Sequence, residues 1–153
     1  MRIIQANTTS DIEAARALFR EYERFLGVDL CFQGFEEELA TLPGRYAPPR
    51  GQLLLARDGE QATGCVALRP LDDGACEMKR LFVRPAYRGR GLGRILATRI
   101  VNAASALGYA VVRLDTLDTL DRAIHIYTAL GFQHRAAYYA NPLPGVVDWE
   151  RGL

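Results

Sequence analysis

The chain has 153 residues, a length that suits one globular domain, and we expect that domain to cover residues 1–153. Hydrophobic residues make up 49% of the sequence and charged residues 24%, a balance that argues against a disordered chain. No apolar run is long enough for a signal peptide or a membrane span, so we expect a soluble, cytoplasmic protein with no membrane partner.

The net charge of +1 hides an uneven distribution. Residues 1–77 carry thirteen acidic and eight basic side chains, whereas residues 78–114 carry no acidic side chain at all. The basic residues in that second stretch are Lys79, Arg80, Arg84, Arg88, Arg90, Arg94, Arg99 and Arg113. Because this patch is local and lacks regularly interleaved aromatic residues, it favours a small polyphosphate ligand over a nucleic acid.

The three cysteines, Cys31, Cys65 and Cys76, are odd in number, widely spaced and set among apolar neighbours. This pattern predicts small core residues and neither a disulfide framework nor a zinc site. His125 and His134 add no local motif for a catalytic cysteine or a metal, so no metal is expected.

The first elements in chain order are a short strand and two helices. Residues 2–6 are apolar enough for a strand. Ser10 and Glu13 predict a capping box, followed by an apolar stripe at helical spacing that ends at Gly27. A weaker helix is predicted over about residues 35–42.

Three strands are predicted next, over residues 52–57, 63–69 and 75–83. The sequences that separate them are Asp58-Gly59 and Asp72-Asp73-Gly74, both typical of hairpin turns. The three strands should therefore form an antiparallel meander.

A loop with glycines at alternate positions follows the third strand of the meander. Gly89, Gly91 and Gly93 lead into a helix whose apolar stripe runs to Leu107 and ends at Gly108. A strand, a glycine loop and a helix make an anion site, because the first amides of a helix lack internal partners and glycine allows close approach of a phosphate.

The last elements are a strand over residues 109–116, a helix and a final strand over residues 146–150. The strand over 109–116 should run parallel to the meander's third strand, because a helix separates them. Thr119 or Asp118 could cap the helix, which runs through Leu130. Its end, Gly131-Phe132, predicts a Schellman motif with an apolar contact.

With this order of elements, the sequence resembles the GNAT superfamily of N-acetyltransferases, and two segments carry the resemblance. Residues 88–93 (RGRGLG), preceded by the strand end at residues 81–85, match that family's [QR]-x-x-G-x-[GA] pyrophosphate loop, and residues 123–132 look like its A-x-x-x-Y-x-x-x-G-F helix. The resemblance implies a fold that combines helices and strands, an α/β fold with the mixed sheet of an α+β protein. It would have a central, mostly antiparallel sheet of about six to seven strands flanked by about four helices.

The resemblance also implies acetyl-CoA as co-substrate. Its diphosphate would lie on Arg88, Gly89, Arg90, Gly91, Leu92, Gly93 and Arg94. Its pantetheine arm would pair with the backbone of Leu81, Phe82 and Val83, whose side chains are also free to pack in the core. One departure concerns Leu120, where many members of the family have an asparagine that helps to bind the coenzyme.

Two catalytic residues follow from the same resemblance. Tyr127 corresponds to the family tyrosine near the sulfur and is predicted to be the general acid, although its helical position also suits a core residue. Glu77 lies where histone-type members carry a catalytic glutamate, and it is predicted to be the base, directly or through a water. The alternative for Glu77 is a strand glutamate that faces solvent or pairs with Arg80.

The acceptor is expected to be an amine of a small molecule or a peptide. The residues predicted near it are Tyr22, Phe25, Phe32, Tyr46, Tyr138, Tyr139 and Asn141. A protein of the same fold that only senses acyl-CoA, without catalysis, is the alternative function, and a homodimer is left open.

Overall fold

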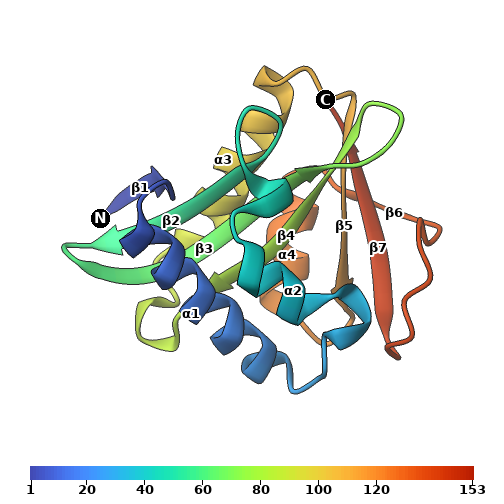
Figure 1. The fold of residues 1–153 in the computed structure, drawn as a ribbon. Helices are drawn as coiled ribbons and strands as arrows, with labels where there is room; N and C mark the ends of the chain where they lie inside the picture. The colour runs from blue at the N-terminus through green and yellow to red at the C-terminus, as the bar shows by residue number, and fades with distance from the viewer.

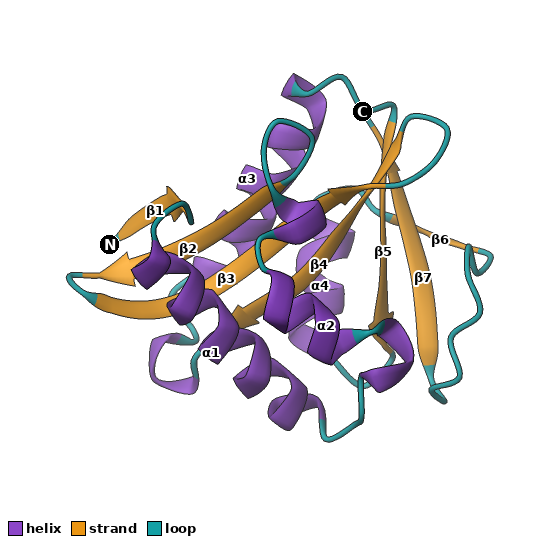
Figure 2. Cartoon of the chain, viewed as in Figure 1, coloured by secondary structure: helices purple, strands orange, loops and turns teal.

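The computed structural model of the protein describes the backbone of residues 1–153 and all side chains except that of Phe32. In this described part, seven strands form one mixed sheet in the order β1-β2-β3-β4-β5-β7-β6, with four α-helices on its faces (Figures 1 and 2). The strands are β1 (Arg2–Gln5), β2 (Gln52–Asp58), β3 (Gln61–Pro70), β4 (Ala75–Val83), β5 (Val111–Leu117), β6 (Gln133–Arg135) and β7 (Val146–Gly152). The helices are α1 (Thr9–Leu26), α2 (Phe35–Thr41), α3 (Leu92–Ala106) and α4 (Asp121–Ala129), and single 3-10 turns cover Cys31–Gln33, Gly44–Tyr46 and Pro85–Tyr87.

The predicted fold class is confirmed. Strands β2, β3 and β4 form the antiparallel meander, and β4 and β5 are the parallel pair expected from the helix between them. The other neighbouring pairs are antiparallel. Strand β6 was not predicted, because its three residues, Gln133–Arg135, are polar and carry no alternating apolar pattern.

The helices cover both faces of the sheet, with α1 and α2 on one side and α3 and α4 on the other (Figure 1). The α1 and α2 side is filled by large buried side chains such as Phe19 and Phe35, and the α3 and α4 side by Leu96, Ile100 and Trp149. Each of these side chains contributes roughly 1.5–3 kcal/mol by burial. These two cores fix the helices relative to the sheet and therefore position the ends of β4, α3 and α4.

Two predicted helix caps are wrong. The capping box of α1 is formed by Thr8 and Asp11, two residues before the predicted pair, and Asp11 is also held by Arg57 at 2.9 Å. Helix α4 begins after Leu120, and no side chain caps it. The reason is that β5 extends to Leu117 and a tight turn leads directly into the helix.

The end of α4 is as predicted. Gly131 adopts a left-handed φ of +88°, and the Phe132 N–H donates to the Tyr127 carbonyl at 3.0 Å, as in a Schellman motif. The Phe132 ring then packs on the Tyr127 ring with centroids 5.8 Å apart. The motif therefore helps to fix the tyrosine that the sequence singled out.

The cysteine prediction is confirmed for two residues and wrong for the third. Cys65 and Cys76 are buried, whereas Cys31 is exposed. Cys31 begins a 3-10 turn that lies outside the two cores, so its apolar sequence neighbours did not imply burial. No helix in the described part of the chain combines the length and apolar character needed to cross a bilayer.

Candidate active site

The site begins where β4 and β5 separate. The two strands pair over three positions, of which the last is Glu77 with Arg113. Beyond that pair the strands diverge, as Figure 1 shows, and the backbone of β4 from Met78 onward has no strand partner on its β5 side. Unpaired backbone N–H and C=O groups on this edge are available to a ligand that carries amides.

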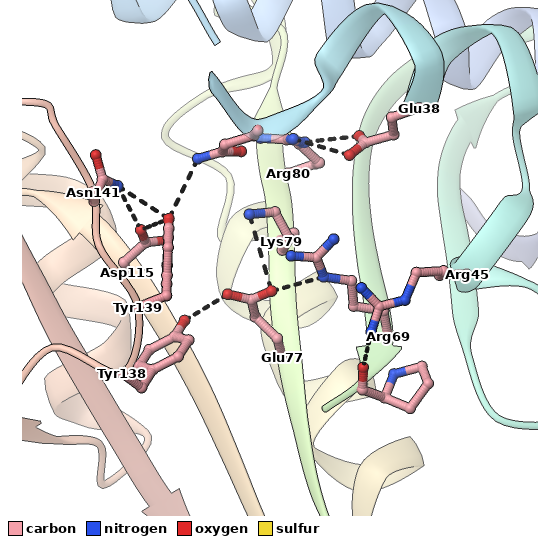
Figure 3. Close-up of polar contacts among 12 residues, drawn as sticks. Glu38, Arg45, Arg69, Glu77, Lys79, Arg80, Asp115, Tyr138, Tyr139 and Asn141 are labelled. Atoms are coloured by element: carbon pink, nitrogen blue, oxygen red, sulfur yellow. Dashed lines mark hydrogen bonds and ion pairs between the residues drawn. The ribbon is translucent and has the colours of Figure 1, made fainter. Parts of the chain in front are cut away.

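A β-bulge in β4 accompanies this separation. Lys79 pairs with Ala67 and Phe82 with Cys65, so two residues of β4, Arg80 and Leu81, oppose one residue of β3. Arg80 has a φ of +61°, a left-handed conformation that is unusual for a non-glycine residue. Its guanidinium donates two hydrogen bonds of 3.0 Å to Glu38 on α2 (Figure 3), and these bonds hold the bulge in place.

A cleft of about 590 Å³ fills the space between the separated strands. Its walls are the second half of β4, the end of β5, the first turns of α3 and α4, the end of α1 and the segment before β7. Leu81, Phe82 and Val83, predicted to face the pantetheine arm, all line it.

The glycine loop closes one end of the cleft. Gly89 and Gly91 have φ values of +80° and +78°, and a side chain added at either position would meet no atom within 4 Å. Gly91 is the N-cap of α3, and no side chain caps that end of the helix. The first amides of α3 are therefore directed to the cleft without a protein side chain to satisfy them, which is the arrangement an anion needs.

Gly93 has a different role. A Cβ at this position would lie 3.1 Å from the Ile126 side chain and 3.8 Å from that of Val83. The third glycine therefore allows α3 to pack closely on α4 and β4.

Only some of the eight basic residues within residues 78–114 lie at the glycine loop, although all eight are close to it in the sequence. Four of them form ion pairs elsewhere: Lys79 with Glu77 at 4.0 Å, Arg80 with Glu38, Arg84 with Glu21 at 2.6 Å, and Arg113 with Glu150 at 2.8 Å. Three belong to the loop or the first turn of α3, namely Arg88, Arg90 and Arg94, and no ion pair among the described side chains involves them.

Arg88 is anchored rather than free. Its Nε donates to the Val83 carbonyl at 2.9 Å, and its guanidinium lies over the Phe25 ring at 4.5 Å. Burial and the nearby charge of Arg122 lower the pKa of Arg88. Two cations gathered near one another here suit an anionic ligand.

Tyr127 lines the cleft from α4 and is 6% exposed. Burial, with smaller effects from Tyr22 and Asp115, raises the pKa of Tyr127, so its phenol remains protonated at neutral pH. In the described part of the chain no hydrogen bond holds its hydroxyl group. The phenol is thus a hydrogen-bond donor available to whatever occupies the cleft.

Glu77 is 1% exposed and directly precedes the residues of β4 that line the cleft. Its carboxylate accepts a hydrogen bond from Arg69 at 2.8 Å and one from the Tyr138 hydroxyl at 2.6 Å (Figure 3). Burial opposes the charge of Glu77, but Lys79, Arg69 and Tyr138 together outweigh it and lower the pKa of Glu77. The partner of Glu77 is therefore Arg69 and not Arg80, and the side chain faces the interior rather than solvent.

Four of the residues predicted near the acceptor line the cleft or bond to its wall. Tyr22, Phe25 and Asn141 line the cleft, and the Tyr139 hydroxyl donates to Asp115 in its wall. Tyr138 is bonded to Glu77 beneath the cleft.

Tyr46 lies away from the cleft. It is 2% exposed and packs edge-on against Phe19 in the core under α1. The side chain of Phe32 lies outside the described residues, so its predicted contact has no structural counterpart here.

Several polar residues that line the cleft were not assigned to the site from the sequence, among them Lys79 on β4, Asp115 on β5 and Gln33 in the turn before α2. Asp115 accepts hydrogen bonds from Tyr139 and, at 2.9 Å, from Asn141, while Gln33 donates to the Tyr139 hydroxyl at 3.4 Å (Figure 3). The available signal was the charged residues within two strands, Lys79 in β4 and Asp115 in β5, since a charge inside a sheet needs a partner or a ligand.

Comparison with known proteins identifies the class. The family model described as "Acetyltransferase (GNAT) family" matches residues 6–132, and the chain belongs to this family of N-acetyltransferases. An uncharacterised N-acetyltransferase of Schizosaccharomyces pombe is 45% identical over 139 residues, which cover 90% of this chain and 85% of the relative.

Solved structures share the fold. An acetyltransferase from Streptococcus agalactiae has a TM-score of 0.82 at 23% identity, covering 99% of this chain and 98% of that chain. The yncA protein of Salmonella typhimurium, solved with its cofactor acetyl-CoA, has a TM-score of 0.75 at 20% identity, covering 99% and 93%. The seven-stranded sheet with its separated central strands is thus the fold of this family.

Proposed function

We propose that this protein transfers the acetyl group of acetyl-CoA directly to the primary amine of a small molecule or peptide. The observation that carries the proposal is the cleft between β4 and β5, which has an uncapped helix N-terminus at one end and a buried phenol beside it. The likeness to yncA, which was solved with acetyl-CoA, supports the choice of co-substrate.

The residues present fit coenzyme A. Residues 88–94 offer amides and guanidinium groups to its diphosphate, and Gly89 and Gly91 leave open space where a phosphate would approach. The unpaired edge of β4 at Leu81, Phe82 and Val83 can bond the amides of the pantetheine arm in strand fashion. The coenzyme supplies an activated acetyl thioester, and the protein supplies the geometry.

Transfer forms a bond between the amine nitrogen and the acetyl carbon and breaks the bond between that carbon and sulfur. The amine loses a proton and the departing thiolate gains one. Tyr127 donates the proton to the thiolate, because its phenol is protonated and faces the cleft. Holding the amine against the thioester supplies much of the remaining acceleration.

Glu77 accepts the proton of the amine in this proposal. It acts through a water, since Glu77 is not among the residues that line the cleft and two hydrogen bonds fix its position. Its lowered pKa keeps it ionised at neutral pH, as a proton acceptor must be. Tyr22, Phe25 and Asn141 form the acceptor side of the cleft, and Tyr138 and Tyr139 hold the carboxylates around it.

Two measurements test the proposal. Coenzyme A and acetyl-CoA should raise the melting temperature, because they bind only the folded chain. A panel of amines should then be screened with acetyl-CoA by the release of free coenzyme thiol. A melting temperature unchanged at saturating coenzyme would reject the site, and coenzyme binding without thiol release for any amine would favour the sensor function.

A further inference from the structure

This inference rests on the proposed function and names the class of its acceptor. We infer that the acceptor is a small zwitterion of the amino acid type, whose carboxylate is bound by Lys79 and whose reactive amine is bound by Asp115 and Gln33.

Lys79 and Asp115 come from opposite walls of the cleft. In the parallel register Glu77 pairs with Arg113, so the residues two positions further, Lys79 and Asp115, face each other on the same side of the sheet. Because the strands have separated there, no ion pair within 4.0 Å joins the two described side chains. A cation and an anion therefore face one cleft without neutralising each other.

The ammonium group of Lys79 is incompletely satisfied. Its side chain is 4% exposed, and the closest carboxylate oxygen is that of Glu77 at 4.0 Å. That same oxygen already accepts the hydrogen bond from Arg69 (Figure 3). Burial lowers the pKa of Lys79 to about 8 despite the nearby carboxylate of Glu77. A buried cation in this situation is costly unless a ligand completes its hydrogen bonds.

Two hydrogen-bond acceptor atoms, one on Asp115 and one on Gln33, have no protein partner among the described atoms. Asp115 receives both of its hydrogen bonds, from Tyr139 and Asn141, on one oxygen, Oδ2. Gln33 uses its amide nitrogen to bond Tyr139, and its buried Oε1 has no partner among the described atoms. An ammonium has three donors and needs such acceptors, so Asp115 Oδ1 and Gln33 Oε1 suit an amine.

A second carboxyl group, that of Asp148, lies next to Asp115, and Asp115 shares the cleft with Tyr127. Asp148 is its direct neighbour on β7 and is 6% exposed, and burial raises the pKa of Asp148 with a further contribution from Asp115. Asp115 and Tyr127, the phenol assigned to the sulfur, line the same cleft, and the charge of Asp115 is one of the causes that raise the pKa of Tyr127. An amine at Asp115 is therefore beside the thioester, whereas Lys79 disfavours an acceptor with a second positive charge.

The test compares matched acceptors on the wild-type enzyme. The standard L-amino acids are assayed beside their amides and their decarboxylated amines, for example phenylalanine, phenylalaninamide and 2-phenylethylamine. Loss of one charge-assisted hydrogen bond lowers kcat/KM by roughly 10–100-fold, so the best amino acid should exceed both of its analogues by that factor. An amide or amine equal to or better than every amino acid overturns the inference.

Variants of Lys79 provide the second arm. Lys79→Met should abolish the preference for the carboxylate chiefly through KM, and Lys79→Arg should retain part of it. Calorimetric titration of the same amino acid and amide into protein saturated with coenzyme A reads binding without turnover, and Lys79→Met should lose binding of the amino acid alone. A Lys79→Met protein that melts cooperatively, binds coenzyme A and keeps the preference also overturns the inference.

The two proposals fail differently. If coenzyme A does not bind and no amine releases thiol, the proposed function is wrong. If coenzyme A binds and amines that lack a carboxylate react well while amino acids do not, only the zwitterionic acceptor is wrong.

Discussion

Glu77 and Arg113 form the last pair of the parallel ladder between β4 and β5, and the cleft opens directly beyond them. Of the two residues proposed to transfer protons, Glu77 belongs to this pair and Tyr127 lines the cleft from α4. The bulge at Arg80 reinforces the separation, because it turns the second half of β4 away from its earlier register. The position of the site is therefore a property of the sheet, and the loops add specificity.

Removing the hydroxyl of Tyr127 should separate catalysis from binding. Tyr127→Phe is expected to lower kcat by roughly 100- to 10,000-fold, because the thiolate loses its proton donor. Coenzyme affinity should change little, since the ring and its packing on Phe132 remain. Steady-state release of free thiol measures kcat, and titration of coenzyme A measures affinity.

Tyr109→Phe is the matched control for that experiment. Tyr109 is also buried, at 4% exposed, but its hydroxyl donates to the Arg50 carbonyl at 2.7 Å and lies outside the cleft. This variant should lose about 1 kcal/mol of stability and keep its kcat. Equal kcat values for Tyr127→Phe and the wild type would return Tyr127 to a packing role.

Helix α3 allows its two ends to be compared with one substitution. Gly91 before its first residue and Gly108 after its last both have φ near +80°, at +78° and +87°, and an added Cβ meets nothing within 4 Å at either position. Alanine at each should cost about 1 kcal/mol of stability through backbone strain. Only Gly91→Ala should weaken coenzyme A binding, by at least about tenfold, because it disturbs the amides to which we assign the diphosphate.

Denaturant unfolding and coenzyme titration of both variants test this expectation. Similar losses of stability with a difference in affinity would support the phosphate site at Gly91. If Gly108→Ala weakened coenzyme binding as much as Gly91→Ala, the effect would belong to the helix as a whole.

The sequence predicted the parts of this fold that depend on local chemistry. The turns at Asp58-Gly59 and Asp72-Asp73-Gly74, the stripe of α3 and the Gly131-Phe132 terminus all specify their structures within a few residues. The Gly-rich loop is likewise local, because its conformation depends on glycines that are present in the chain. Two of them, the glycine loop and the helix end at Gly131-Phe132, also belong to the segments that carried the family resemblance.

The remaining features depend on contacts between distant residues. The bulge at Arg80 requires Glu38, which is 42 residues away, to hold an arginine in a left-handed conformation. Besides the ion pair with Arg69, Glu77 accepts a hydrogen bond from Tyr138, 61 residues away, and no pattern around either residue indicates that bond. Lys79 and Asp115 become facing residues only through the register of two strands. For this reason the glycine loop and the strand that precedes it were predictable, whereas the hydrogen bonds of Glu77 and the facing charges of Lys79 and Asp115 were not.

The role of Glu77 can be separated from its structural contacts by two variants. Glu77→Gln keeps the shape of the side chain but removes the charge, and kcat should fall by roughly 100-fold if Glu77 accepts the proton. Tyr138→Phe keeps the carboxylate and removes one of its hydrogen bonds, so kcat should change by less than about tenfold. Both variants should be less stable than the wild type by about 1–3 kcal/mol, because each leaves a buried polar group unpaired.

Rates and unfolding free energies of these two variants decide between catalysis and structure. A Glu77→Gln enzyme with normal kcat and reduced stability would show that Glu77 supports the sheet beneath the cleft. In that case Asp115, which does line the cleft, would be the carboxylate to test next by Asp115→Asn.

The buried charge of Lys79 should lower the free energy of unfolding of the protein without a bound acceptor. Burial lowers its pKa from 10.5 to about 8, against the opposing effect of Glu77, and the positive charges of Arg80 and Arg69 lower it further while Asp115 raises it. Between pH 8 and 10.5 the unfolded chain therefore binds a proton that the folded chain does not. The free energy of unfolding should rise with pH across this window.

Replacing this lysine with methionine should remove that dependence. Lys79→Met is expected to be more stable than the wild type by about 1–3 kcal/mol at pH 7, and the difference should shrink as the pH rises from 8 toward 10.5. Urea unfolding at several pH values between 6 and 10 measures it, with Lys79→Arg as the variant that keeps the charge. A Lys79→Met protein less stable than the wild type at pH 7 would show that the ammonium stabilises Glu77 in the free protein. A Lys79→Met protein that is more stable but less active would show that the buried ammonium of Lys79 destabilises the free protein and serves to bind the acceptor.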